Sequence, residues 1–158
     1  MLNTHARWIG LVVAAMTLSG CGGGEVTERH HAHNGDLRES TASAGELPDF
    51  LEGQREEIRL VYRAAAEAAG LLEGMPCYCG CGESAGHASN RDCFIHEIRE
   101  DGSILWDDHG TRCGVCLDIA AESIDLKLQG KSDREIRQHI DGKYKEGYAK
   151  PTATPMPA

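Results

Sequence analysis

Six of the seven cysteines of this chain lie within residues 77–116, and this crowding limits the fold more than any other feature. Three of them alternate along the string MPCYCGCGESAGH (residues 75–87), and two more form a CxxC pair. A disulfide between alternating cysteines closes a very small ring, which disulfide geometry tolerates poorly. Disulfides would therefore have to join the string to the later cysteines, and metal ligation is the other way to hold the thiols together. The six are Cys77, Cys79, Cys81, Cys93, Cys113 and Cys116.

The spacing of the cysteines favours convergence on a metal. Alternate side chains of an extended segment point to one side, and Gly80 and Gly82 let the backbone bend around a small object. Cys113 and Cys116 share a face at a predicted helix start, where backbone N–H groups favour thiolates. Two histidines lie close in sequence, one after the string and one before the CxxC pair. The predicted metal ligands are Cys77, Cys79, Cys81, Cys93, Cys113, Cys116, His87 and His109.

A thiolate-rich site is soft, which selects Cu(I), zinc or iron–sulfur clusters. A structural zinc needs only four ligands, and six cysteines with histidines exceed that number. We therefore expect Cu(I), in a mononuclear or polynuclear site, with zinc as the second choice. Two alternatives stay open: a disulfide-stapled interaction module without metal, and a thiol–disulfide oxidoreductase that uses Cys113 and Cys116. We expect no enzyme, and we predict no catalytic residue.

The N-terminus reads as an export signal. An apolar run from Trp8 to Leu18 follows Arg7, and it is shorter than the about 20 residues that a membrane span needs. The sequence Leu-Ser-Gly-Cys that ends at Cys21 is similar to a bacterial lipobox, so we expect residues 1–20 to be a lipoprotein signal peptide and Cys21 to carry the lipid. The predicted location is the extracytoplasmic face of a bacterial cell membrane; an ordinary secretory signal is the alternative.

Three segments follow the signal. Residues 21–46 are rich in Gly, Ser, Thr and charge, which predicts a flexible tether. Its histidines, His30, His31 and His33, are either a solvated polar stretch or a loose capture site for Cu or Zn. We expect the cysteine-rich domain at residues 47–148 and a disordered tail at residues 149–158.

The predicted fold is mainly α, a small α+β domain of three helices, a cysteine-rich loop and a β-hairpin, stapled by metal or disulfides. Apolar periodicity predicts helices over residues 47–75 and 111–130, and a capping box that starts at Ser132 predicts the third. Two β-prone runs around Asp101-Gly102 predict the hairpin over residues 93–110. Aromatic residues are only 5% of the chain, so the core is small and needs a staple.

The charge of the chain excludes one class of partner and suggests another. Sixteen Lys and Arg stand against 25 Asp and Glu, a formal net charge of −9, so we expect no nucleic-acid binding. An acidic surface suits a basic docking partner, such as a protein that donates or accepts copper. The expected partners are therefore the membrane, through the lipid, and such a copper protein.

Several strings together are similar to those of a known family. MPCYCGCG, GHASNRDCF, DHGTRCGVCLDIA and GKSDREIRQHIDGKY resemble the bacterial PCYCGC-motif lipoprotein family over about residues 58–147. The resemblance implies that the six cysteines named above are the motif cysteines. It also suggests metal handling, particularly of copper, and agrees with a lipid on Cys21. Sequestration and delivery to an exported or membrane acceptor both remain open as roles.

Overall fold

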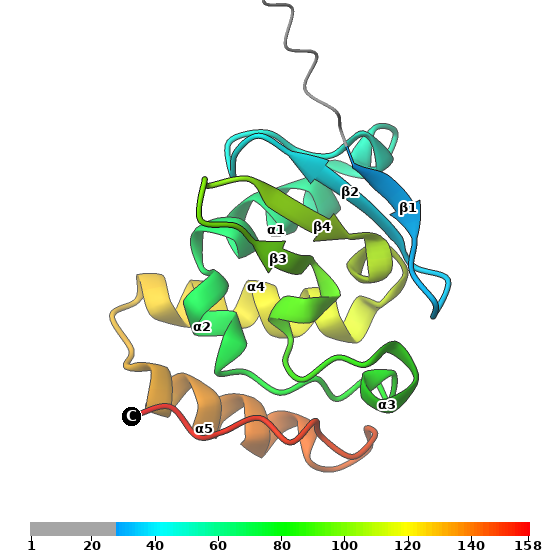
Figure 1. The fold of residues 1–158 in the computed structure, drawn as a ribbon. Helices are drawn as coiled ribbons and strands as arrows, with labels where there is room; N and C mark the ends of the chain where they lie inside the picture. The colour runs from blue at the N-terminus through cyan, green and yellow to red at the C-terminus, as the bar shows by residue number, and fades with distance from the viewer. Residues whose placement is uncertain (1–27) are drawn as a thin grey trace, which may run out of the picture.

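A four-stranded antiparallel sheet and a set of helices make up the fold of residues 28–158, the part of the chain that this computed structural model describes (Figure 1). The predicted signal peptide and Cys21 lie outside the described residues. The strands follow the order β1-β2-β4-β3 across the sheet. Their bounds are β1 (Arg29–His31), β2 (Leu37–Thr41), β3 (Ile95–Ile98) and β4 (Ile104–Asp107).

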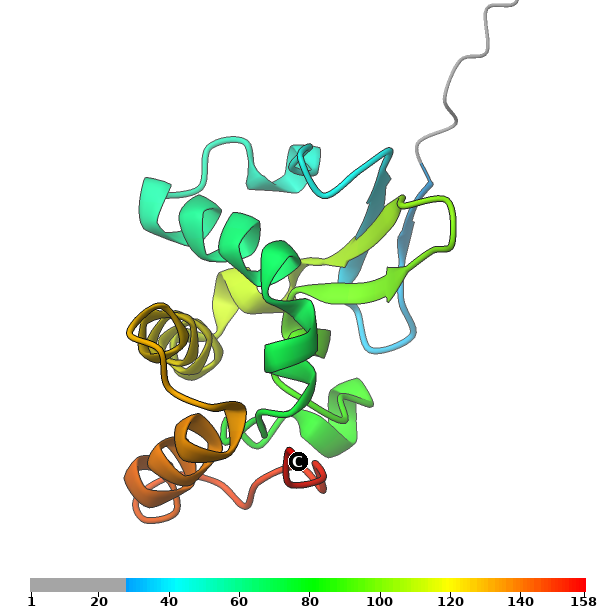
Figure 2. The same ribbon diagram turned by 90° about the vertical axis from the view of Figure 1, so that its left-hand side faces the viewer.

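Helices pack against one another below and behind the sheet in Figure 1. α1 contacts α4, and α4 contacts α5, so that α5 lies at the end of the molecule remote from the sheet (Figures 1 and 2). The α-helices are α1 (Glu56–Glu67), α2 (Ala69–Glu73), α3 (Gly82–Ala85), α4 (Gly114–Leu128) and α5 (Asp133–Tyr144). Three short 3-10 helices join them: η1 (Asp49–Leu51), η2 (Arg91–Cys93) and η3 (Asp108–Arg112).

The prediction of a mainly α fold with three helices is wrong, because the described residues form an α+β fold with five α-helices and a four-stranded sheet. The segment predicted as one helix, residues 47–75, is η1, α1 and α2 in succession. Gly53 at φ 79° lies in the turn after η1, and Ala68 at φ −107° and ψ 22° leaves the helical region between α1 and α2. Apolar periodicity runs through both breaks, since the buried stripe continues from one helix to the next.

The segment predicted as a flexible tether supplies half of the sheet. β1 pairs with β2, and β2 pairs with β4, both antiparallel. The side chains of these strands are mostly polar, and they find partners in the fold: Arg38 Nε lies 3.0 Å from a carboxylate oxygen of Asp107, and the buried Glu39 carboxylate accepts the Asp49 N–H at 2.7 Å. These strands were not predicted from the sequence, because they are held by ladder hydrogen bonds and ion pairs and show no apolar pattern.

The last ten residues, predicted as a disordered tail, pack along the cysteine string. Thr152 N–H donates to the Cys77 carbonyl at 3.1 Å, and Cys77 N–H donates to Thr152 Oγ1 at 2.9 Å. The buried Arg137 of α5 donates through one nitrogen to the carbonyls of Gly74, Thr154 and Pro155, each at 3.1 Å. A chain rich in Pro and Ala is held here by its backbone groups, which composition does not reveal.

The hairpin and the last two helices were predicted correctly. β3 and β4 flank Asp101-Gly102, and Gly102 takes the left-handed conformation at φ 87°. The Ser132–Glu135 capping box opens α5 with both reciprocal hydrogen bonds. Against the sheet, Tyr62 of α1 packs edge-on to Phe94 and lies 6.2 Å from Trp106 between ring centroids. No helix among the described residues is long and apolar enough to cross a membrane.

Candidate metal centre

The cysteine string runs between the sheet and α5, with its side chains divided between two directions. Cys77 is buried on the side of α4, where its sulfur lies 3.2 Å from the Cys116 sulfur. Tyr78 points instead to α5, where its hydroxyl donates to the Asp141 carboxylate at 2.7 Å and its ring packs on Tyr144. The tyrosine therefore anchors the string and leaves the flanking thiols to face α4.

A turn after Cys79 keeps the string compact. Gly80 has φ 84°, which strains any residue with a side chain, and a Cβ there would meet the Ala149 Cβ at 3.1 Å. The turn lets the Cys81 N–H donate to the Cys79 sulfur at 3.3 Å. An N–H donor of this kind favours the thiolate form of Cys79.

The N-terminus of α4 supplies two more thiols. Cys113 is the N-cap of this 15-residue helix, and Cys116 lies one turn further on, fully buried. Free N–H groups and the helix dipole make this position favourable for negative charge. Asn90, also fully buried, donates to the Cys116 carbonyl at 3.2 Å and so ties the helix start to the segment before η2.

Four of the sulfurs form a continuous series of contacts. The Cys77 sulfur lies 3.0 Å from that of Cys79 and 3.2 Å from that of Cys116. The Cys116 sulfur in turn lies 3.1 Å from that of Cys93, which ends η2. These separations fall between the about 2.05 Å of a disulfide and the about 3.8 Å expected for two thiolates at about 2.3 Å from one tetrahedral metal. Because a disulfide pairs each sulfur once, it satisfies only part of this series, whereas metal thiolates can share a sulfur.

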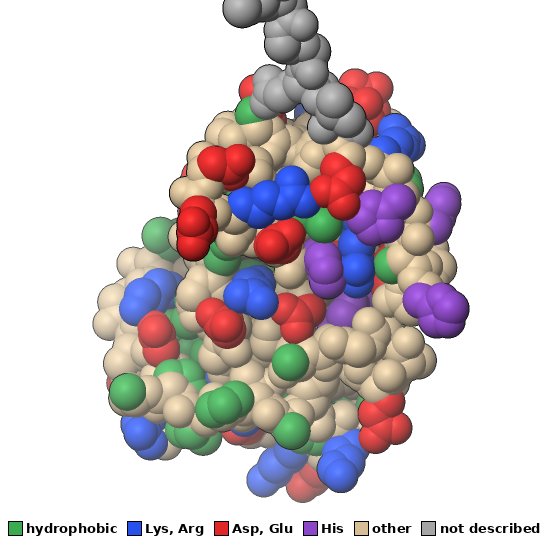
Figure 3. All heavy atoms as spheres, viewed as in Figure 1, with side chains coloured by type: hydrophobic (Ala, Val, Ile, Leu, Met, Phe, Trp, Pro, Cys, Tyr) green, Lys and Arg blue, Asp and Glu red, His purple; other side chains and the backbone are tan. Residues whose placement is uncertain are grey.

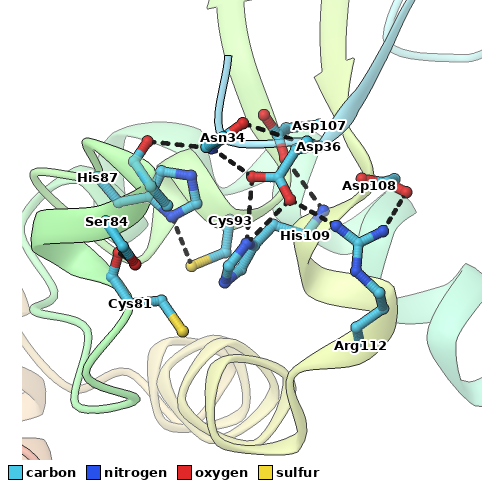
Figure 4. A network of polar contacts seen from close by, with 12 residues as sticks. Asn34, Asp36, Cys81, Ser84, His87, Cys93, Asp107, Asp108, His109 and Arg112 are labelled. Atoms are coloured by element: carbon cyan, nitrogen blue, oxygen red, sulfur yellow. Dashed lines mark hydrogen bonds and ion pairs between the residues drawn. The ribbon is translucent and has the colours of Figure 1, made fainter. Parts of the chain in front are cut away.

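His109 reaches the thiols from the sheet side (Figure 4). Its backbone N–H donates to Asp107, and its Nδ1 lies 3.2 Å from the Asp36 carboxylate, so the proton is held at Nδ1. Nε2 is buried without a hydrogen-bond partner. The next residue, Gly110, lets the Phe94 ring pack directly on the backbone beside His109, since a Cβ at this position would meet that ring at 2.6 Å. An imidazole oriented by a carboxylate, with its other nitrogen free, is the arrangement of metal-binding histidines.

His87 lies on the opposite side of Cys93, between α3 and η2 (Figure 4). Its Nδ1 is 3.5 Å from the Cys93 sulfur, and its ring centroid is 4.7 Å from that of His109. Its Nε2 is also buried and without a partner. A buried polar atom without a partner is costly, so two such imidazole nitrogens beside thiols indicate a site that a cation completes.

Seven of the eight predicted ligands enter groups that can hold a metal ion, with ligand atoms within 4.8 Å of one another. The groups overlap: one is Cys79, His109, Cys113 and Cys116; the next is Cys77, Cys93 and Cys116; the third is His87, Cys93 and His109. Cys81 belongs to none of the groups found among the described residues. The residues present thus fit a soft metal, whose identity the geometry leaves open.

Two carboxylates near the centre were not predicted as part of it. Asp36, Asp107 and His87 form a further group. Both carboxylates already have cationic partners, Arg112 for Asp36 and Arg38 for Asp107, so their main role here is to hold His109. The pair Asp107-Asp108 beside His109 was a visible signal in the sequence. Asp36 gave none, because only the β2–β4 pairing brings it to the site.

The thiols share their protons unequally. Hydrogen bonds from Cys113 and Cys116 lower the pKa of Cys79 to about 4, and hydrogen bonds from Cys116 and Cys77 lower that of Cys93 to about 7. The pKa of Cys116, the donor in both cases, is raised. The Cys79 thiolate, followed by Asp36, raises the pKa of His109 to about 9. At neutral pH the metal-free cluster therefore holds a thiolate at Cys79 and a partly ionised Cys93, and it keeps protons on Cys116 and His109.

The histidines of the predicted tether lie elsewhere. His30 and His31 are exposed on β1, and histidine side chains gather on this side of the surface in Figure 3. His30 Nδ1 lies 3.4 Å from Glu28, and His31 Nδ1 lies 3.3 Å from the Gly35 carbonyl. With His33, they enter none of the metal-holding groups found among the described residues.

Comparison with known proteins gives one match. A family model described as "Protein of unknown function with PCYCGC motif" matches residues 10–157, nearly the whole chain. No curated protein and no solved structure matches the chain. The match confirms the resemblance that the cysteine strings indicated. The chain therefore belongs to the PCYCGC-motif family, whose function is unknown.

Proposed function

We propose that the protein is a lipid-anchored, extracytoplasmic lipoprotein that binds soft metal, foremost Cu(I), at the candidate centre. It would sequester the ion or deliver it to an exported or membrane acceptor. The observation that carries the proposal is the convergence of five sulfurs and two orphan imidazole nitrogens, from four separate segments, on one buried region. Burying so many thiols together with unpaired polar atoms is costly unless a cation binds them.

The ligand set supports Cu(I) over zinc. Thiolate sulfur and imidazole suit both ions. One group, Cys79, His109, Cys113 and Cys116, has the composition of a structural zinc site, which makes zinc the second candidate. A single zinc would leave the three-sulfur group of Cys77, Cys93 and Cys116 incompletely used. A soft monovalent ion accepts such an all-sulfur environment readily.

The membrane location rests on the sequence before the described residues. Cys21 ends a lipobox-like string after an apolar run, and its lipidation would leave an even set of six thiols for the domain. The acidic surface would suit a basic partner that exchanges copper. Replacement of Cys21 by Ala should release the protein from the membrane fraction and abolish incorporation of labelled fatty acid.

The structure gives less support to an oxidoreductase. The buried Cys116 has a raised pKa, and the thiol whose pKa falls furthest is Cys79, outside the CxxC pair. Three further cysteines and two histidines around the pair have no role in a two-thiol exchange.

Metal analysis tests the proposal. The full-length protein, purified in detergent under anaerobic conditions from copper-supplemented cells, should carry at least one copper per chain and bind Cu(I) in preference to zinc. Replacement of Cys113 and Cys116 by Ser should abolish the copper. Cys81→Ser is the matched control, since Cys81 is outside the metal-holding groups, and should retain it. The proposal would be contradicted by a protein that is purified with three disulfides and no metal. Such a protein would also have to bind no Cu(I) after its disulfides are reduced.

A further inference from the structure

The seven ligands of the centre cannot all bind one ion. Two ligands of a single metal at about 2.3 Å can lie no farther apart than about 4.6 Å. Cys77 and Cys93 fall outside the group formed by Cys79, His109, Cys113 and Cys116, although that group is defined at a slightly longer limit of 4.8 Å. The two sulfur groups have one member in common, Cys116. The two groups that contain several cysteines thus define two subsites that share one sulfur, and the third group, His87, Cys93 and His109, takes one ligand from each of them.

The subsites differ in their access to solvent. In the subsite of Cys77, Cys93 and Cys116, which we call the inner subsite, the exposed fractions are 1%, 0% and 0%. In the subsite of Cys79, His109, Cys113 and Cys116, the outer subsite, only Cys116 is fully buried. Cys81, partly exposed, lies next to Cys79, to which its N–H donates.

Hydrogen bonds from other segments enclose the inner subsite but not the outer one. Cys77 is hydrogen-bonded on both sides of its peptide to Thr152 of the C-terminal segment, and Asn90 binds the Cys116 carbonyl. We therefore expect an ion to leave the inner subsite only after one of these contacts breaks. The outer subsite needs no such opening, since the sulfurs of Cys79 and Cys113 belong to partly exposed residues.

We propose that the centre holds two soft metal ions of the same kind bridged by the Cys116 sulfur, the inner one retained and the outer one exchangeable. This inference rests on the proposed function and goes further, since it gives one centre both a retained and a mobile ion. A thiolate has lone pairs for two ions, and Cys116 already contacts sulfurs of the inner group at 3.1 and 3.2 Å. Each ligand that still carries a thiol proton releases it to solvent when the ion binds, and no electron is transferred.

Charge also favours a second ion. Five thiolates around one monovalent cation would leave most of their negative charge buried, and a second cation removes a further unit.

Exchange kinetics test the inference. The full-length protein in detergent, reduced and loaded anaerobically with excess Cu(I), should show two copper ions per chain in native mass spectrometry. Bathocuproine disulfonate should then remove copper in two phases of one equivalent each, with the slower at least about tenfold slower. Cys79→Ser should lose the fast phase and keep one slowly removed ion. Cys81→Ser, the matched control, should keep both phases.

Each outcome has one meaning. One equivalent of copper, or two removed in a single phase, overturns the two-subsite inference and leaves the proposed function intact. No copper at all overturns the proposed function itself. Cys93→Ser should lose the slow phase; should that variant fail to fold by circular dichroism, the wild-type kinetics and the Cys79 variant still decide. Equal loss of both phases in Cys79→Ser contradicts the inference.

Discussion

The molecule has two buried regions built from different chemistry. Between α1 and the sheet, the aromatic core of Tyr62, Phe94 and Trp106 is closed by ring contacts, and the Tyr62 hydroxyl donates to the Asp107 carbonyl at 2.8 Å. Between α4, η2 and the cysteine string, the sulfur centre keeps two imidazole nitrogens without partners. In the first region the Tyr62 hydroxyl and the Trp106 indole N–H both have hydrogen-bond partners, whereas the second region offers groups of ligands that could hold a cation. We therefore expect the aromatic region to keep its order without metal and the sulfur centre to depend on metal for its order.

Metal removal should have the largest effect and should act on one region only. A ligand present at a thousand times its dissociation constant stabilises a fold by about 4 kcal/mol. We expect apoprotein to lose hydrogen-exchange protection over residues 75–93 and at the start of α4, while α1 and β4 stay protected. Hydrogen–deuterium exchange of holo and apo protein measures this. Equal loss of protection in α1 and β4 would show that the two regions do not respond independently to metal.

Loss of the carboxylate that orients His109 should have the next largest effect. Partners that hold a metal-binding histidine contribute about 10–100-fold to metal affinity. Asp36→Ala should weaken Cu(I) binding by that factor in a chelator competition, and Asp36→Asn, which keeps an acceptor for Nδ1, should recover most of it. Asp49→Ala, an exposed carboxylate remote from the thiols, is the control. An unchanged Cu(I) affinity in Asp36→Ala would argue against His109 as a ligand of the centre.

A change in the aromatic core should separate stability from metal binding. Tyr62→Phe leaves the buried Asp107 carbonyl without its donor, at a cost of about 1–3 kcal/mol in the free energy of unfolding. Copper stoichiometry should stay that of the wild type. Denaturant unfolding and elemental analysis of the same preparation measure both. Loss of copper in a folded variant would show that the two regions act as one.

Thiol reactivity should distinguish neighbouring cysteines of the string in reduced apoprotein. The pKa of Cys79 is lowered to about 4, so it is a thiolate throughout the neutral range and should react with iodoacetamide at a rate independent of pH. Burial and the Cys79 thiolate raise the pKa of Cys81 to about 11, so its rate should rise about tenfold per pH unit up to that value. Peptide mass spectrometry of timed samples measures both rates, and parallel profiles would contradict the proton arrangement.

Short-range sequence patterns correctly predicted the features that depend on neighbouring residues. Alternation placed Cys77 and Cys79 on one side of the string with Tyr78 on the other, and i, i+3 spacing joined Cys113 to Cys116 at the start of α4. The features that depend on long-range pairing were missed. Polar strands β1 and β2 looked like a tether, because their stability comes from the ladder with β4 and from ion pairs. The C-terminal segment looked disordered, since it is held by the distant Arg137.

Copper-edge X-ray absorption of the fully loaded protein tests the central claim most directly. We expect copper in the monovalent state with mainly sulfur neighbours at about 2.3 Å, a minor nitrogen contribution and a copper–copper contact that disappears in Cys116→Ser. Copper coordinated only by nitrogen and oxygen would contradict it, because the ion would then be bound outside the sulfur centre.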